Sequence, residues 1–331
     1  MKIKIFKIFS LTILLSLNCK NYNQRKVYQK TFFQLDTVVT ITITENFLKP
    51  LKFKKISLDI ENLLEKYDKI FNIHNKKSDV YKISKFKKNK WYKINKELFN
   101  LIKICKKFYS LTEGYFDPTI GSITLLYKFH NNAIPPSLKE ISKFLLYVGM
   151  NNVTLKLPNF ISLNKVPIFL DFGGVAKGYI IDKISDFLKL KGIKNFMVNI
   201  GGDIYVSGKN PKNSKWVIGI QHPRIYNEIV TKFEITNKSI VTSGDYERFF
   251  FYNGKRYHHI INPKTGLPVW NGIVSVTIIA DSALIADILS TSVFLMGKEK
   301  GINLLKSFNE IKYLIIEETN YKELKFYSNY L

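Results

Sequence analysis

A strand that runs into two glycines and then into a helix is the feature that most constrains this chain. Residues 161–170 are predicted to form a strand, and the spacing over 176–190 predicts a helix that Gly192 ends. Gly173-Gly174 lets a ligand approach closely, and free N–H groups at a helix start favour anions. Lys177 adds a cation for a phosphate. An ordinary strand–turn–helix with a solvated lysine gives the same pattern, so this segment alone does not define a site.

The rest of the chain interleaves strands and helices. Residues 37–44 (TVVTITIT) alternate and are β-branched, which predicts a strand, whereas apolar residues over 56–71 recur at helical spacing. Further predicted elements are helices over 95–111 and 282–296 and strands over 196–200, 204–206, 216–220, 232–235 and 273–279, with a loop over 131–137. Because no interdomain linker is visible, we expect one compact α+β unit, a mixed β-sheet with packed helices.

The charge of the chain favours a membrane surface over a nucleic acid as a partner. The formal net charge is +25, but only four of the 51 basic residues are arginines. Readout of phosphate or guanine by paired hydrogen bonds favours arginine, and the lysines are spread along the whole chain. We therefore expect no nucleic-acid partner, and attraction to an anionic membrane surface is the better interpretation.

The N-terminus reads as an export signal. Lysines precede the ten-residue apolar stretch 8–17, which is too short to span a bilayer comfortably and ends just before Cys19. This arrangement resembles a lipoprotein signal, in which Cys19 is lipidated; an ordinary cleaved signal peptide or an uncleaved anchor are the alternatives. We expect a signal over 1–19, a tether over 20–30 and a domain over 31–331. The protein would be an exported, membrane-anchored lipoprotein on the inner membrane, facing the periplasm or cell exterior.

A carboxylate and a hydroxyl share one face of the predicted helix 282–296. Asp287 and Thr291 are four residues apart, and together they offer the hard oxygen ligands that Mg2+ prefers. A helix with a single polar stripe is the alternative. The surrounding residues are apolar, however, and a buried aspartate is costly without a partner, for which a metal is a natural choice.

Two adjacent histidines, His258 and His259, precede the turn Asn262–Gly266. Neighbouring residues on a strand face opposite sides, so only one of the pair can face a site. That histidine is a candidate general acid or base. A hydrogen-bonded core histidine is an equally good interpretation, and a zinc site lacks a clear third nitrogen or sulfur ligand.

Two further turns are weaker candidates. Residues 112–119 place Tyr115 and Phe116 beside Asp117, as a flavin or adenine pocket would, and residues 242–248 (TSGDYER) form a polar glycine turn that enters a strand. A surface turn explains either segment alone.

Together and in this order, these segments resemble the ApbE family from about Leu35 to Gly297. The matching segments are TEGYFDPTIG (112–121), LDFGGVAKGYIID (170–182), NIGGDIYVSG (199–208), WVIGIQHP (216–223), TSGDYER (242–248), HHIINPKTGLPV (258–269) and ADILSTSVFLMG (286–297).

The resemblance implies an FAD:protein FMN transferase. Such an enzyme uses Mg2+ to cleave FAD, joins FMN to a threonine or serine hydroxyl of an acceptor protein and releases AMP. The acceptor would be a redox protein such as a subunit of an Na+-pumping quinone reductase or an Rnf-type complex. A periplasmic FAD pyrophosphatase that releases FMN and AMP, or a non-catalytic FAD-binding lipoprotein, would use the same site.

The resemblance also implies roles for individual residues. Asp287, Ser290, Thr291 and the carbonyl of Gly174 would bind Mg2+, and His259 and Asp287 would be catalytic. The residues implied to contact FAD are Leu35, His74, Tyr115, Phe116, Asp117, Asp171, Lys177 and His259.

Three positions depart from the family pattern. Leu35-Asp36-Thr37 stands where the family has Met-Gly-Thr, His74 stands where a tyrosine often stacks on the flavin, and Asn262 replaces a usual aspartate. These changes bear on flavin affinity more than on the metal site.

Overall fold

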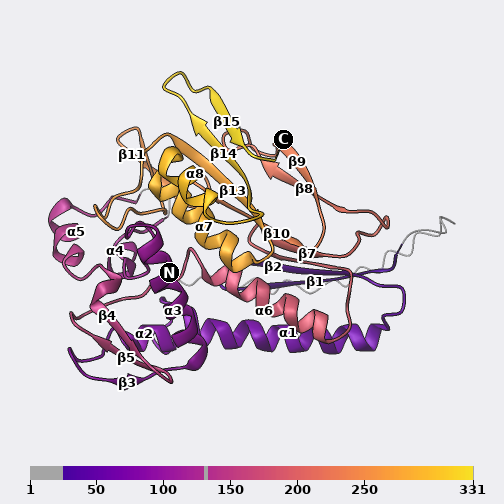
Figure 1. Ribbon diagram of the computed structural model, residues 1–331, viewed down its shortest axis with the longest axis horizontal. Coiled ribbons are helices and arrows are strands. Elements are labelled where there is room, and N and C mark those ends of the chain that lie inside the picture. The colour runs from indigo at the N-terminus through magenta and orange to yellow at the C-terminus, as the bar shows by residue number, and fades with distance from the viewer. Residues whose placement is uncertain (1–24, 130–132, 331) are drawn as a thin grey trace, which may run out of the picture.

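An eight-stranded sheet forms the centre of the computed structural model, which describes residues 25–129 and 133–330 (Figure 1). Every ladder between its neighbouring strands is antiparallel. In spatial order the strands are β1 (Val27–Gln34), β2 (Thr37–Thr44), β6 (Phe196–Ile200), β7 (Asp203–Ser207), β10 (Lys238–Gly244), β13 (Ile273–Ala280), β14 (Lys312–Glu318) and β15 (Leu324–Ser328). The predicted α+β class is confirmed. The sheet is antiparallel rather than mixed because hairpins join many of its neighbouring strands.

Three small sheets and eight α-helices surround the central sheet in the described part of the chain. The small sheets are β3 (Tyr92–Lys93) with β5 (Phe160–Leu163) and β4 (Val153–Lys156), β8 (Trp216–Gln221) with β9 (Ile229–Ile235), and β11 (Phe249–Tyr252) with β12 (Lys255–His258). The helices are α1 (Pro50–Phe71), α2 (Asp79–Ile83), α3 (Lys96–Leu111), α4 (Gly121–Thr124), α5 (Leu138–Leu145), α6 (Ala176–Leu190), α7 (Ala283–Met296) and α8 (Lys298–Lys306), with a 3-10 turn at Met150–Asn152.

The central sheet is covered on both faces. Helices α1, α6 and α7 pack on one face, around a large core that includes Val276 and Ile278 of β13. The β8–β9 pair covers the other face, where Trp216 packs with Val274 and Ile279. Ile278 and Ile279 thus serve different cores, as the alternation of side chains along a strand requires, while Val274 departs from this alternation at the register shift between Ile273 and Ser275.

A carboxylate on α6 fixes the position of this helix relative to α7. Asp182 of α6 accepts hydrogen bonds from the hydroxyl of Ser282 (2.6 Å) and from the backbone N–H groups of Ala283 (2.8 Å) and Leu284 (3.1 Å). These donors lie at the N-terminus of α7, which leaves such groups without partners in its own turn. Asp182 therefore sets the position of α7 relative to α6.

Several expectations from the sequence need correction. The predicted strand 161–170 ends at Leu163, since residues 164–166 bend away; beyond Pro167, Phe169 forms only an isolated parallel bridge with Ile120. The segment 242–244 belongs to β10 instead of a turn. Residues 27–30, expected in a tether, belong to β1.

The proposed export signal and Cys19 lie outside the described residues. None of the helices within 25–129 and 133–330 is both long and apolar enough to cross a membrane. Cys105 is fully buried on α3, as expected of a core residue, and this burial raises the pKa of its thiol.

Candidate active site

A cavity of about 460 Å³ gathers most of the residues singled out in the sequence. The β1–β2 turn, the end of α1, the start of α6, the end of β10 and the inner face of α7 form its walls. Among its lining residues are Leu35, His74, Tyr115, Phe116, Asp117, Asp171, Gly174, Lys177, Arg248, His259, Asp287 and Thr291. Segments more than 200 residues apart in the chain therefore share one cavity.

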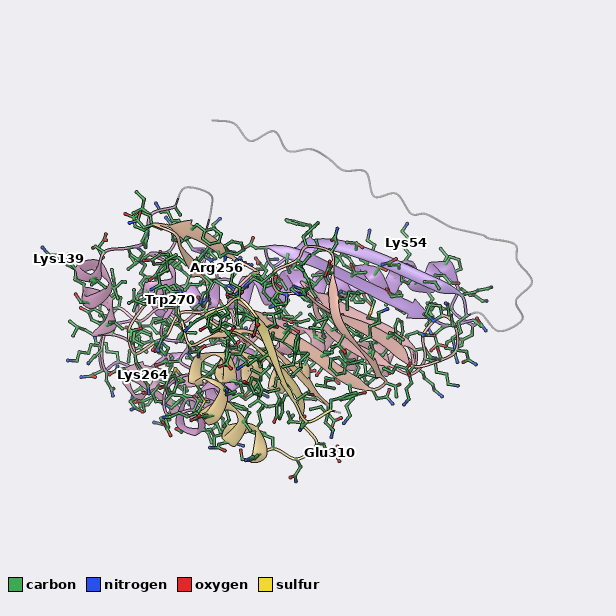
Figure 2. All side chains as sticks on the ribbon, turned by 90° about the horizontal axis from the view of Figure 1, so that it is seen from above. Lys54, Lys139, Arg256, Lys264, Trp270 and Glu310 are labelled. Carbon is green, nitrogen blue, oxygen red and sulfur yellow. The ribbon has the colours of Figure 1, made fainter. Side chains whose placement is uncertain are left out.

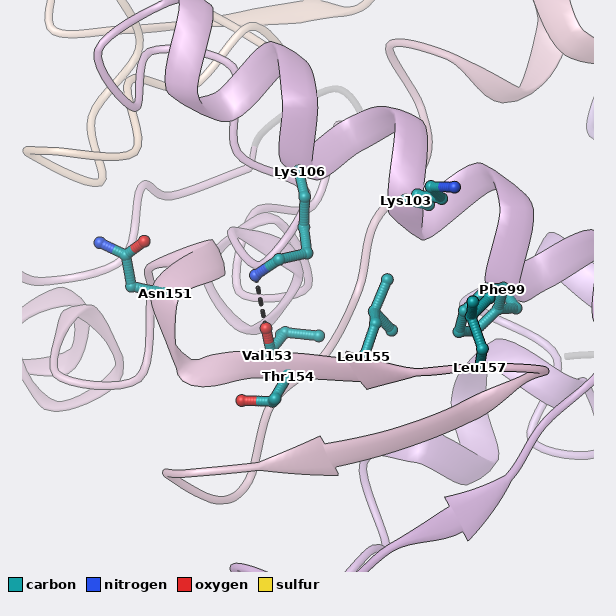
Figure 3. A pocket seen from close by; sticks show the side chains of 8 residues that line it. All are labelled: Phe99, Lys103, Lys106, Asn151, Val153, Thr154, Leu155 and Leu157. Atoms are coloured by element: carbon teal, nitrogen blue, oxygen red, sulfur yellow. Dashed lines mark hydrogen bonds between the residues drawn. The ribbon is translucent and has the colours of Figure 1, made fainter.

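A second hollow, of about 530 Å³, lies between α3 and β4 and has different chemistry (Figure 3). The amine of Lys106 is turned to the backbone there, donating to the carbonyls of Met150 (2.9 Å) and Val153 (2.5 Å). None of its eight lining residues is acidic, so it offers no carboxylate to a metal. The first cavity is the candidate active site.

Asp287 lies where α7 meets the start of α6. Its carboxylate accepts a hydrogen bond of 3.0 Å from the N–H of Gly178 and is buried. A Cβ added at Gly178 would lie 2.3 Å from the carbonyl oxygen of Ala283, so only glycine permits this approach of the two helices. Burial and the carboxylate of Asp203 raise the pKa of Asp287, and Lys177 opposes that rise.

Hydroxyl groups from α7 and β10 lie in the same part of the site as Asp287. Thr291 faces Gly174 so closely that a Cβ on the glycine would lie 3.0 Å from the threonine hydroxyl. Ser243 of β10 is hydrogen-bonded to the hydroxyls of Ser290 (2.8 Å) and Thr291 (3.3 Å). Ser290 is fully buried and also donates to the carbonyl of Asp287 at 3.0 Å. It lies behind the lining residues and helps to hold Ser243 in place.

This arrangement offers only one acidic side chain beside the hydroxyls. In the described ranges, no three His, Cys, Asp or Glu side chains lie close enough to hold a metal together. The oxygen atoms of Asp287 and Thr291, with the backbone at Gly174, are the hard donors that Mg2+ prefers. Since Mg2+ usually retains water and binds substrate phosphates beside one or two carboxylates, this small donor set fits it.

Lys177 is held by a residue that the sequence analysis did not assign. Its amine forms an ion pair with Asp203, which is buried at the start of β7. Burial would lower the pKa of Lys177, but Asp203 and Asp287 together raise it above its usual value. Lys177 therefore carries a fixed positive charge into the cavity.

The sequence signal for Asp203 was the Gly201-Gly202 turn before it, which stands in the NIGGD segment. Glu247 also lines the cavity and was not assigned. Burial raises the pKa of Glu247, while Lys177 lowers it.

The two histidines face opposite sides, as the alternation along a strand predicts. His258 is buried beside Phe294 and uses both ring nitrogens, with Nε2 2.7 Å from the carbonyl of Val269 and Nδ1 3.3 Å from the N–H of Ile260. It is a hydrogen-bonded core histidine. His259, just past the end of β12, lines the cavity.

The environment of His259 keeps it neutral. Loss of solvent around the ring, together with the nearby His258, Arg248 and Lys177, lowers the pKa of His259 to about 3. Its Nδ1 lies 3.3 Å from the carbonyl of Arg248, a group that can only accept a hydrogen bond. The proton of the neutral ring is therefore assigned to Nδ1, which leaves the lone pair of Nε2 free.

Two aspartates organise the turns of the cavity wall. Asp171 accepts hydrogen bonds from the hydroxyl of Thr124 (2.6 Å) and the N–H of Gly173 (2.8 Å). Asp117 accepts both the N–H (2.9 Å) and the hydroxyl (2.6 Å) of Thr119, and burial raises the pKa of Asp117 to about 6. Both side chains hold backbone in place at the edge of the cavity.

Four assigned residues remain: Phe116 is buried in the large core and also lines the cavity, whereas Leu35, His74 and Tyr115 lie around the cavity rim. Tyr115 is covered by the amine of Lys264, 3.8 Å from the ring centroid, and His74 is exposed after the end of α1. Leu35 and Asp36 form the β1–β2 turn with φ of +59° and +56°. This left-handed conformation is costly for residues other than glycine, and strain of this kind is often found at functional sites.

The cavity brings together a buried carboxylate, neighbouring hydroxyls, a lysine held in an ion pair and a histidine, which are groups suited to an enzyme that binds phosphates. The particular family follows from the comparisons. The model of the ApbE family matches residues 35–315, and the chain belongs to this family.

Named relatives and solved structures agree with this assignment. The chain is 31% identical over 271 residues to the FAD:protein FMN transferase of Vibrio cholerae serotype O1 (strain O395), which covers 81% of this chain and 80% of the relative. It is 32% identical over 268 residues to the FAD:protein FMN transferase of Buchnera aphidicola subsp. Schizaphis graminum. This match covers 79% of this chain and 78% of the relative. The solved structure of the flavin transferase ApbE from Vibrio cholerae superposes with a TM-score of 0.82 at 28% identity, covering 92% and 98%.

Proposed function

We propose that this protein transfers FMN from FAD to a threonine or serine hydroxyl of an acceptor protein, with Mg2+ as the metal and AMP as the second product. The relatives named above carry the transferase activity in their names. The observation that carries the proposal is the single cavity in which Asp287, Thr291, Lys177 and His259 meet. Cleaving the pyrophosphate of FAD to transfer FMN needs positioned positive charge more than covalent help from the protein, and Lys177 and the other groups of this cavity can provide it.

The reaction forms one phosphorus–oxygen bond and breaks another. The acceptor oxygen attacks the phosphorus on the FMN side of FAD, and the bond to the bridging oxygen breaks, so AMP leaves with that oxygen. The proton of the attacking hydroxyl passes to the free Nε2 of His259. Bound phosphates add negative charge beside this ring, which raises its pKa and makes it a better base than it is in the empty cavity.

The other residues of the cavity hold the reacting groups. Lys177 and the free N–H groups at the start of α6 bind the phosphates. Asp287, Thr291 and the backbone of Gly174 would hold Mg2+, with Ser290 supporting Thr291 through Ser243. When bound, Mg2+ supplies charge neutralisation at the pyrophosphate. Leu35, His74 and Tyr115 at the rim would surround the flavin.

The acceptor is proposed to be a membrane redox protein, such as a subunit of an Na+-pumping quinone reductase or an Rnf-type complex. The protein itself would be exported and anchored through lipidated Cys19 on the outer side of the inner membrane. Enzyme and acceptor would then meet on the same surface.

The proposal is tested with the full-length protein, FAD, Mg2+ and a fragment of a candidate acceptor. Covalently bound flavin is read as fluorescence of the acceptor band in a denaturing gel. We expect a fluorescent acceptor that requires Mg2+ and is lost in Asp287→Ala. Ser185→Ala, on α6 but away from the cavity, is the matched control and should label the acceptor normally. Free FMN with an unlabelled acceptor would instead indicate a pyrophosphatase.

A further inference from the structure

Lysines and exposed apolar side chains lie together at one end of the central sheet. Val27 at the start of β1 pairs with Thr44 at the end of β2, and the N–H of Lys26 donates to Asn46 at 2.9 Å. The end of α6 joins them, since the N–H of Lys194 donates to Glu45 at 2.8 Å. These contacts bring the β2–α1 loop and the α6–β6 loop to one place.

The loop after β7 completes this end. The N–H of Arg25 donates to the carbonyl of Pro211 at 2.9 Å, and the hydroxyl of Thr44 donates to the carbonyl of Lys209 at 2.8 Å. In Figure 1 the starts of β1 and α1 and the end of α6 lie toward the right, and Figure 2 places Lys54 at the end opposite Lys139. We call residues 25–28, 44–59, 189–196 and 208–215 the basic end.

The charge of the basic end is strongly one-sided. Its four segments contain twelve basic residues and two acidic ones. Both acids are already used: Glu45 is buried and accepts from the Lys194 and Asn195 backbone, and Asp59 pairs with Lys191 at 3.6 Å. The remaining lysines face solvent and leave a positive surface.

Exposed apolar side chains stand among these lysines. Leu190 is 87% exposed and Leu51 is 82% exposed, with Phe47 at 60% and Val27 at 52%. Large apolar side chains next to lysines suit a bilayer interface, where the chains enter the headgroup layer and the lysines meet anionic lipid. A nucleic acid backbone would offer no apolar environment for Leu51 and Leu190.

The position of the first described residues also favours a membrane contact at the basic end. The described residues begin at Arg25, within this end, and only five residues separate Arg25 from Cys19. Six steps of extended chain reach about 20 Å. An anchor at Cys19 would therefore keep Arg25, and the basic end around it, within about 20 Å of the bilayer.

We propose that the basic end rests on an anionic lipid membrane. Strand β1 runs from Val27 at this end to the Leu35 turn at the cavity, about 27 Å at the usual rise per residue. The contact would hold the Leu35 turn at most about 27 Å above the basic end and fix the direction in which the cavity faces. This inference does not depend on the reaction, because the lysines of the basic end lie outside the cavity lining.

The test measures which end of the full-length protein contacts lipid. An environment-sensitive dye is attached to Leu51→Cys or, as the matched control, to Leu138→Cys, which is 69% exposed on α5 beside Lys139 at the opposite end. Cys105 is fully buried, and the parent protein, which keeps both Cys19 and Cys105, gives the baseline when it is carried through the same labelling. Vesicles contain phosphatidylcholine alone or with phosphatidylserine, plus headgroup-quencher lipid.

We expect the dye at position 51 to shift to the blue and be quenched in the vesicles with phosphatidylserine, while the dye at 138 changes in neither. Lys49→Glu, Lys52→Glu and Lys54→Glu together should abolish the shift and leave the rate of FAD turnover unchanged. A dye at 51 that stays in water would overturn the proposal. So would protection at 51 in cell membranes but not in lipid vesicles, which would indicate a protein partner.

Discussion

Replacing Gly178 with alanine tests how closely α6 and α7 must approach to place Asp287. The added Cβ would lie 2.3 Å from the carbonyl oxygen of Ala283 and 2.8 Å from the Cβ of Asp287. Contacts between carbon and carbonyl oxygen are ordinarily about 3.3 Å or longer, so the helices must separate by about 1 Å.

This shift should cost little unfolding free energy but much of the reaction rate. Overpacking costs about 1–3 kcal/mol, and the better helix propensity of alanine returns about 1 kcal/mol, so we expect Gly178→Ala to lose about 1 kcal/mol of unfolding free energy. A displacement of about 1 Å at a catalytic group costs about 100-fold in rate. The variant should therefore remain folded while its rate of AMP release from FAD falls about 100-fold.

Ser185→Ala is the control on the same helix. The Ser185 hydroxyl is buried and has no hydrogen-bond partner among the described residues, so its removal should raise the unfolding free energy by about 1 kcal/mol without changing the rate. Urea denaturation and chromatographic measurement of AMP give the two quantities. A Gly178→Ala enzyme with wild-type rate and stability would refute the close contact between the helices.

Three further predictions concern charge and strain. The pKa of His259 is lowered to about 3, below its unfolded value near 6.5, so the unfolded state takes up a proton and stability is lost as pH falls through this window. His259→Gln should therefore lose less unfolding free energy than the parent between pH 7 and pH 4.5 in urea titrations; an identical loss contradicts the assignment. At φ of +56°, Asp36→Gly should be about 1 kcal/mol more stable than Asp36→Ala, and equal thermal stabilities would argue against the left-handed turn. Lys177→Met leaves Asp203 buried and unpaired, which should cost about 3 kcal/mol and be partly restored by adding Asp203→Asn; no restoration would show that the ion pair is not the cause.

The strongest periodic patterns were predictable from the sequence alone. The strand 37–44 and the helix 176–190 appear with the expected bounds, because alternation and helical spacing are set by which face is buried. The predicted strand 161–170 was wrong past Leu163, although the sequence itself places the polar residues Asn164 and Lys165 there, followed by Pro167, which cannot donate a ladder hydrogen bond. Strand β1 was partly assigned to a tether because its burial pattern is mostly exposed at the sheet edge.

The candidate site was predictable where local spacing determines it. Asp287 and Thr291 share a helical face, and the alternation at His258 and His259 correctly required that only one of them face the cavity. Asp203 and Ser243 could not be assigned in this way. Their importance comes from long-range contacts, an ion pair to Lys177 and hydrogen bonds to α7, and no spacing in the sequence encodes these.

The most direct test of the central claim compares two products of one reaction. The full-length protein is incubated with FAD, Mg2+ and an acceptor fragment, and released AMP and acceptor-bound flavin are measured over the same time course. We expect equal amounts of the two at every time point, little free FMN, and loss of both products in Asp287→Ala. AMP matched by free FMN, with the acceptor mass unchanged, would contradict it.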